Sequence, residues 1–265
     1  MSSLPTELLA VIISHISDRP SLLALSVTAK VLNTEAVRML YRHIRISSFK
    51  TFDAYNTQAT LNPGLCHYVR SFEIRLNPGP HYLYWTEERL SSFGVLMSNM
   101  PYLVELDINS HMEDDMWNTL ITSTAHSGAR ITHFRCRLRY RINLDIIVSF
   151  LEFQPTIKSL KFSSPRRGPN LSPSSIPPSI LPNLKAIEGY FLPLNPFFSG
   201  RPIRRLNIRD DDMTKFPTES ALPVSAEVVR IGCCPVNFPS LPALLYLDLV
   251  CTTCQVMSPS SSYPH

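Results

Sequence analysis

Apolar residues in about the first forty positions recur three and four residues apart, which is the spacing of amphipathic α-helices. Pro5 and Glu7 suit the first turn of one helix, and Ser3 is placed to cap it. Asp18 is placed to cap a second helix, and Thr28 a third. Three helices in so short a segment cannot enclose a core of their own. We therefore expect part of their apolar surface to pack on the rest of the chain or to bind a partner.

After this segment, the pattern apolar-x-x-apolar-x-apolar returns along the chain. Its copies begin at residues 41, 69, 103, 131, 157, 184, 203, 228 and 244. The second and third apolar positions are two residues apart, as on one face of a β-strand. In the middle of the array the copies are roughly 26 to 34 residues apart, a spacing typical of repeats that each add one strand to a stack.

Three segments between the copies carry helical periodicity, namely Trp85–Met100, Met112–His126 and Ile142–Phe153. A proline precedes several copies by one or two residues, at Pro101, Pro155, Pro182, Pro202 and Pro242. Proline ends a helix and favours extended backbone, so this placement supports the predicted strands. Residues 163–181 are rich in proline without a helical period, which predicts a loop crossing there. The sequence thus predicts an α/β fold of stacked strand-and-helix units with a parallel sheet.

The N-terminal segment also carries a more specific set of residues: Leu4, Pro5, Glu7, Leu8, Leu9, Ile12, Ile16, Leu22, Leu25, Val27, Lys30, Leu40 and Tyr41. These residues and their spacing resemble an F-box. The segment departs from that family's pattern at Ala29, where a cysteine is common, and at Leu32, where an aromatic residue is common. Both positions stay apolar. The alternative interpretation is an ordinary amphipathic helical cap.

The residues that follow extend the resemblance. An Asn-Pro-x-Leu turn at Asn62–Leu65 precedes Val-Arg-Ser at Val69–Ser71, where the irregular repeats begin. This arrangement resembles the fungal group of F-box proteins with degenerate leucine-rich repeats. The resemblance implies a three-helix F-box-like segment over residues 1–46, an irregular leucine-rich-repeat solenoid over 47–250 and a tail over 251–265. It further implies that the helices bind a Skp-type adaptor, and through it a cullin, with contacts expected at Leu4, Pro5, Leu8, Leu9 and Ile12.

Arginines alternate with apolar residues in one predicted strand and therefore share one face of it, at Arg135, Arg137, Arg139 and Arg141. Outward positions of other strands add Arg45, Arg75, Lys161 and Arg209, tempered by Glu73, Asp107, Glu188 and Asp248. Guanidinium groups suit carboxylate or phosphate, so this basic streak is a candidate site for an acidic or phosphorylated protein. A charged outer face that serves solubility alone is the alternative.

Composition narrows the classes of function. The net charge of +4 is too small to argue for bulk nucleic-acid binding. No stretch has the length of a membrane span or the features of a signal peptide. The six cysteines lack disulfide-framework spacing, which favours the cytoplasm or nucleus.

Candidate chemistry in the sequence is sparse. No nucleophile elbow, phosphate-binding loop or zinc-protease motif occurs, so we expect neither enzymatic activity nor a cofactor. The run Asp210–Asp212 is an ordinary solvated acidic cluster in our interpretation. Cys251 and Cys254, with the nearby pair Cys233–Cys234, form only a weak zinc signal, and Cys233 is better explained as an inward apolar position.

Two functions are consistent with these observations. The first is the substrate-recognition subunit of a Skp-cullin-F-box ubiquitin ligase, with the adaptor on the helices and a protein target on the repeats. The second is a leucine-rich-repeat interaction scaffold that binds an acidic partner or RNA without any ligase. The first requires an exposed apolar surface on the N-terminal helices and the second does not.

Overall fold

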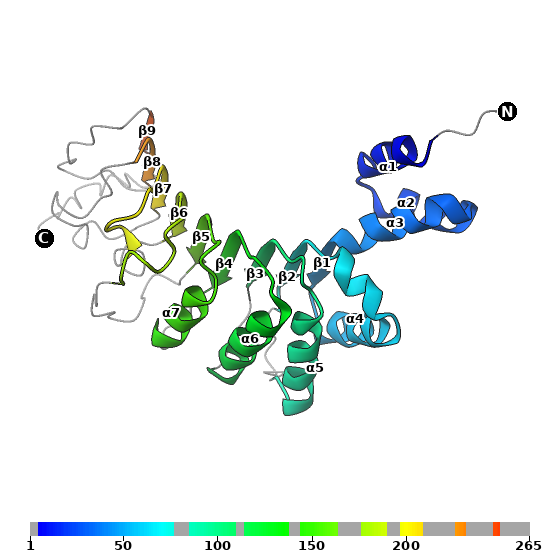
Figure 1. Cartoon of the computed structure of the whole chain (residues 1–265), viewed down its shortest axis with the longest axis horizontal. Coiled ribbons are helices and arrows are strands. Elements are labelled where there is room, and N and C mark those ends of the chain that lie inside the picture. The colour runs from blue at the N-terminus through cyan, green and yellow to red at the C-terminus, as the bar shows by residue number, and fades with distance from the viewer. Residues whose placement is uncertain are drawn as a thin grey trace, which may run out of the picture.

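The structure is a computed structural model that describes residues 5–76, 85–109, 114–137, 144–163, 176–189, 197–208, 226–231 and 246–249. Within these residues the fold is mixed α/β (Figure 1). The helices are α1 (Thr6–Ser14), α2 (Arg19–Thr28), α3 (Lys30–Arg42), α4 (Phe49–Leu61), the 3-10 helix η1 (Pro63–Tyr68), α5 (Glu87–Ser98), α6 (Asp114–Ser127) and α7 (Leu144–Glu152).

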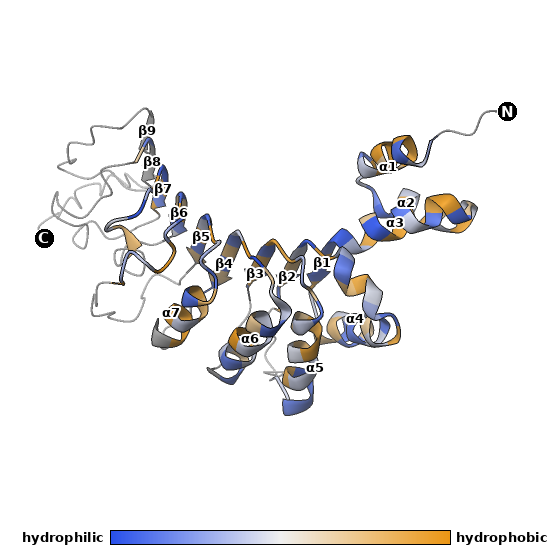
Figure 2. Ribbon diagram, viewed as in Figure 1, coloured by the Kyte–Doolittle hydropathy of each residue, from blue (hydrophilic) through white to orange (hydrophobic). Residues whose placement is uncertain are grey.

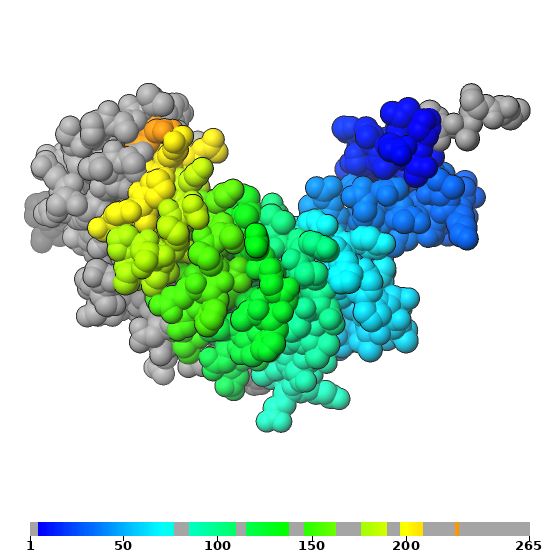
Figure 3. All heavy atoms as spheres, viewed as in Figure 1, coloured from blue at the N-terminus to red at the C-terminus, as the bar shows by residue number. Residues whose placement is uncertain are grey.

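The strands form one parallel sheet of nine strands whose order follows the chain, as the repeating pattern predicts. They are β1 (His43–Ile46), β2 (Ser71–Ile74), β3 (Glu105–Ile108), β4 (His133–Arg137), β5 (Ser159–Ser163), β6 (Ala186–Gly189), β7 (Arg205–Ile208), β8 (Val228–Ile231) and β9 (Tyr246–Leu249). The sheet lines the inner side of a curved molecule and α4 to α7 lie on the outer side, while α1 to α3 stand at one end (Figures 1 and 3).

One copy of the pattern was predicted in the wrong register. The other strands begin two residues after the start of their copy, but β8 begins at Val228 itself. The copy therefore starts at Ala226, which is fully buried, and Ile231 rather than Cys233 pairs with Ile208 of β7. A slip of two residues preserves the alternation of inward and outward positions, so alternation alone does not detect it.

The core lies between the sheet and its outer helices. Phe134 of β4 is buried and packs against Phe150 of α7 with ring centroids 4.8 Å apart. Trp117 of α6 completes this aromatic cluster, 6.2 Å from Phe134. The inward third position of β4 is Cys136, which is 1% exposed, as its place in the pattern predicts. The units that have a described helix thus bury their apolar side against that helix and against neighbouring units.

Helix boundaries differ from prediction in three places. Asp18 caps α2 as expected, its carboxylate accepting a hydrogen bond from the Ser21 amide at 2.9 Å. Thr28 does not cap α3, since it is the last residue of α2 and its hydroxyl donates to the Ala24 carbonyl. The N-cap of α1 is Pro5, without a side-chain cap, and Ser3 lies outside the described residues.

The third difference is α4, which the sequence interpretation missed. Ser48 and Thr51 form a capping box at its start, each side-chain oxygen accepting a hydrogen bond from the other residue's amide. Phe52, Tyr55 and Ala59 bury one face of the helix at spacings of three and four residues. The loop predicted over 163–181 and the tail 251–265 lie largely or wholly outside the described residues.

Candidate functional site

The first candidate is a surface on α1, α2 and the start of α3. Large apolar side chains are exposed there to about half or more: Leu8 50%, Val11 55%, Ile12 53%, Leu23 49%, Val27 84% and Val31 54%. We call these six residues the apolar surface. Figure 2 shows its hydrophobic colour on α1 and at the end of the α2–α3 pair that points away from the sheet. The other four exposed large hydrophobic residues of the described chain are scattered over α4, α5, the loop before β3 and the loop after α7.

Different residues hold the helices together. Ile13 of α1, Leu22 of α2 and Ala36 of α3 are buried between the three helices. The Asn33 side-chain amide donates to the Ser26 carbonyl at 2.6 Å and ties α3 to α2. The apolar surface consists of other side chains, which keep about half or more of their area exposed.

Helix α3 fixes the position of this unit against the sheet. It ends at Arg42 and β1 begins at His43, so no linker separates them. Tyr41, at the end of α3, packs against the main core and lies 6.4 Å from Tyr55 of α4, centroid to centroid. The apolar surface is therefore held in a defined orientation relative to the strands.

The predicted adaptor contacts fall on or near this surface. Leu8 and Ile12 are exposed on one face of α1, whereas Leu9 is half-buried. Pro5 is exposed at the N-cap of the helix. Leu4 lies outside the described residues. The structure thus places Pro5, Leu8 and Ile12 on exposed positions of α1, and the apolar surface adds four further residues to the predicted contacts: Val11, Leu23, Val27 and Val31.

The second candidate is the exposed face of the strands. Its central row holds residues that are in lateral register across the sheet: Arg45, Glu73, Asp107, Arg135, Lys161, Glu188 and Asn207. Ion pairs link neighbours in this row, Arg135 to Asp107 at 3.0 Å and Lys161 to Glu188 at 2.6 Å. Arg45 reaches Glu73 at 3.6 Å. The carboxylates that the sequence analysis set against the basic streak lie beside its cations in this row, three of each, so the described part of the row carries no net charge.

The structure describes two of the four candidate arginines, Arg135 and Arg137. Arg135 pairs with Asp107, and Arg137 donates a long hydrogen bond of 3.4 Å to the Asn109 side chain. Arg139 and Arg141 lie outside the described residues. The side chains that neutralise or orient these arginines come from the neighbouring strand, which no pattern within one strand reveals.

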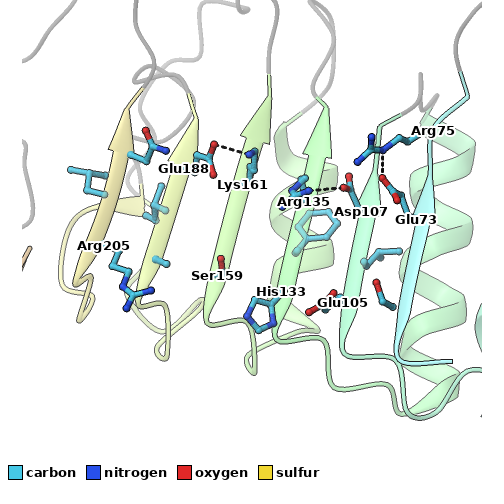
Figure 4. A pocket seen from close by; sticks show the side chains of 17 residues that line it. Glu73, Arg75, Glu105, Asp107, His133, Arg135, Ser159, Lys161, Glu188 and Arg205 are labelled. Carbon is cyan, nitrogen blue, oxygen red and sulfur yellow. Dashed lines mark hydrogen bonds and ion pairs between the residues drawn. The ribbon is translucent and has the colours of Figure 1, made fainter. Parts of the chain in front are cut away.

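The strand face is hollowed between β2 and β7 (Figure 4). The hollow has a volume of about 540 Å³ and is open to solvent. The small side chains of Ser159 and Ala186 form the floor of the hollow. His133 lies to one side of them and Arg205 to the other, and all four residues are in lateral register across the strands. We call this feature the strand-face hollow.

Neither surface shows signs of a reactive centre in the described residues. No group of three or more His, Cys, Asp or Glu side chains there is placed to hold a metal ion. Burial raises the pKa of the Cys136 thiol, which opposes thiolate chemistry. Cys233, Cys234, Cys251 and Cys254, like Asp210–Asp212, lie outside the described residues. No described helix is long and apolar enough to cross a membrane.

Comparison with known proteins gives no family assignment. No protein-family model matches the chain, and no curated protein matches it.

Proposed function

We propose that this protein is the substrate-recognition subunit of a Skp-cullin-F-box ubiquitin ligase, an F-box protein with degenerate leucine-rich repeats. The helices α1 to α3 would dock on a Skp-type adaptor, and the strand face would bind the protein target. The subunit itself performs no chemistry in this proposal. It raises the effective concentration of the target near a ubiquitin-charged enzyme.

The observation that carries the proposal is the concentration of exposed apolar side chains on α1 to α3. Of the ten large hydrophobic residues exposed in the described chain, six belong to the apolar surface. A concentration of exposed apolar side chains on one part of a protein surface marks an interaction site. The F-box-like residues Leu8 and Ile12 are within it, so the resemblance and the exposure point to the same partner.

The energetics are sufficient for stable docking. Fully burying a leucine or isoleucine side chain contributes about 1.5 to 3 kcal/mol, and roughly half of that remains available to a half-exposed side chain. Removing both Leu8 and Ile12 from an interface should then cost about 1.5 to 3 kcal/mol. That loss weakens binding roughly tenfold or more.

The test is binding of a purified Skp-type adaptor to the full chain, measured by calorimetry. We expect Leu8→Ala with Ile12→Ala to weaken binding by the amount above. The matched control is Leu61→Ala with Val95→Ala, which truncates two side chains that are 69% and 60% exposed on other helices. The control should bind as the wild type does. A folded wild-type chain that fails to bind at micromolar concentration would overturn the proposal.

The second candidate is a repeat scaffold that binds an acidic partner or RNA through the strands, without a ligase. The strand-face hollow favours it, because that feature does not involve α1 to α3. The scaffold becomes the better account if the adaptor does not bind but a strand-face ligand does.

A further inference from the structure

Three successive units place a cation immediately before the strand, in the second position of the repeating pattern. These residues are Lys158 before β5, Lys185 before β6 and Arg204 before β7. Arg205, the first residue of β7, follows at once and lines the strand-face hollow. All four side chains are exposed. We call these four residues the basic rim. The sequence interpretation missed it because it examined only the outward positions within the strands.

The basic rim differs from the strand row above it in that three of its four cations have no carboxylate partner among the described residues. Lys161 and Arg135 of the strands each have a carboxylate partner. In the described part of the chain, the rim's carboxylate contact is the pair Arg204–Glu227 at 3.5 Å, whose side chains are 61% and 37% exposed. No ion pair involves Lys158, Lys185 or Arg205 there. The rim therefore presents a local excess of positive charge.

Backbone hydrogen bonds fix the spacing of the basic rim. The Lys185 amide donates to the Lys158 carbonyl at 2.8 Å, and the Arg204 amide donates to the Lys185 carbonyl at 2.8 Å. Adjacent strands lie about 4.8 Å apart, so the three Cα atoms extend over about 10 Å. This equals the length of about three residues of extended chain, which rise about 3.3 Å each. Figure 4 shows Arg205 near the start of β7, at the end of the hollow where the strands begin.

We propose that the basic rim binds an acidic polypeptide segment, a run of Asp and Glu residues that crosses the starts of β5 to β7. The flanking part of the segment enters the strand-face hollow over Ser159 and Ala186. Lysine ammonium groups act as separate point charges, which suits several carboxylates in a row. This inference deepens the proposed function by assigning the chemistry of the target, and it rests on that function only for the target's role as a ligase substrate.

The charges beside the rim favour a polypeptide over RNA. Four carboxylates and four Lys or Arg side chains line the hollow, so its formal charges cancel, and Glu105 has no cation partner among the described residues. The hollow therefore offers no excess positive charge to a uniformly anionic backbone that continues into it. A polypeptide places its acids on the rim and other side chains over the hollow. The rim itself also contains no aromatic side chain of the kind on which bases stack.

The experiment measures binding of a fluorescent peptide to the full chain without any adaptor. The probe contains a run of six glutamates, and its reference carries six glutamines instead. We expect saturable binding of the glutamate peptide that weakens with added salt, and no binding of the glutamine peptide at about 1 mM protein. The double variant Lys158→Glu with Lys185→Glu should weaken binding of the glutamate peptide at least about tenfold. The double variant Lys158→Gln with Lys185→Gln should weaken it less.

The matched control is Lys30→Glu with Lys50→Glu, which makes the same change in net charge at exposed positions of α3 and α4. It should leave peptide binding within about twofold of wild type. The control also separates a local site from the net charge of the protein, because screened interactions beyond about 10 Å contribute little at physiological salt.

Several results would overturn the inference. The first is no binding of the glutamate peptide by the wild type, and the second is an equal loss of affinity in the rim and control variants. The third is that a uridine oligonucleotide of about twelve residues binds more tightly than the glutamate peptide and that the rim variant abolishes this binding. The last result assigns the rim to RNA. Since no adaptor is present, failure here leaves the proposed ligase function standing, and failure of adaptor binding leaves the rim standing.

Discussion

Arg201 is buried although its side chain is charged. Only 4% of the residue is exposed, and it is the one charged residue that is buried in the described part of the molecule. Its guanidinium donates hydrogen bonds to the carbonyls of Ile180 at 2.9 Å, Pro177 at 2.7 Å and Ile176 at 3.1 Å. It also lies over the ring of Phe197. Burial lowers the pKa of Arg201, but arginine's ordinary pKa is so high that the group stays charged. The Arg201 side chain thus supplies hydrogen-bond donors to three backbone carbonyls in a unit where no described helix lies beneath the sheet.

Replacing Arg201 by lysine should destabilise the fold although the charge is kept. A single ammonium group cannot reach carbonyls spread around a planar fork, so buried acceptors lose their donors. We expect a loss of about 2 to 4 kcal/mol in the free energy of unfolding, measured by urea denaturation. The exposed Arg137→Lys should change it by less than about 0.5 kcal/mol. Equal effects of the two substitutions would contradict this role.

At the scale of elements, the helices are stabilised in different ways. Helix α4 has a reciprocal cap and a buried face, whereas α1 has no side-chain cap and exposes Leu8, Val11 and Ile12. Short helices are marginal in water unless packing or caps support them. Helix α1 is therefore the element that gains most from a partner.

The cap of α4 can be tested without disturbing its core face. Ser48→Ala removes the acceptor for the Thr51 amide and should cost about 1 kcal/mol of stability. Ser48→Asp restores an acceptor and adds a favourable charge at the helix start, so it should retain wild-type stability. The measurement is the urea midpoint of both variants. An aspartate variant as unstable as the alanine variant would exclude the capping role.

At the scale of the whole molecule, the strands follow the chain order, and each unit contacts its neighbours. Stability in such an array is a sum of local and nearest-neighbour contributions, so the middle is held from both sides. Helix α1 is instead attached at the end of the array and packs chiefly on α3.

Hydrogen exchange should reveal this gradient. We expect the amides of Leu106, Phe134 and Leu160, in central strands, to exchange at least about 100-fold more slowly than the amides of α1. Bound adaptor should slow exchange in α1 and leave the central strands unchanged. Uniform exchange rates along the chain would mean that α1 is integrated into the core.

Much of the fold was determined by the sequence alone, because helices and strands bury their faces at fixed local periods. The spacing of apolar residues predicted α1 to α3, α5 to α7 and the strands, and placed Phe134 and Cys136 inward. The exposure of Leu8 and Ile12 also followed from the small size of the helical segment. The missed helix α4 carried the same local signals in Ser48, Phe52 and Tyr55.

The tertiary structure alone decided which charges are neutralised. Asp107 and Arg135 are far apart in the sequence but adjacent across two strands, so an apparently basic strand becomes part of a paired row. Lys158, Lys185 and Arg204 belong to three different repeats and form the basic rim only when parallel strands stack in register. The register of β8 was decided in the same way, by pairing with β7. Lateral neighbours come from different repeats, and a pattern within one repeat contains no information about what stands beside it.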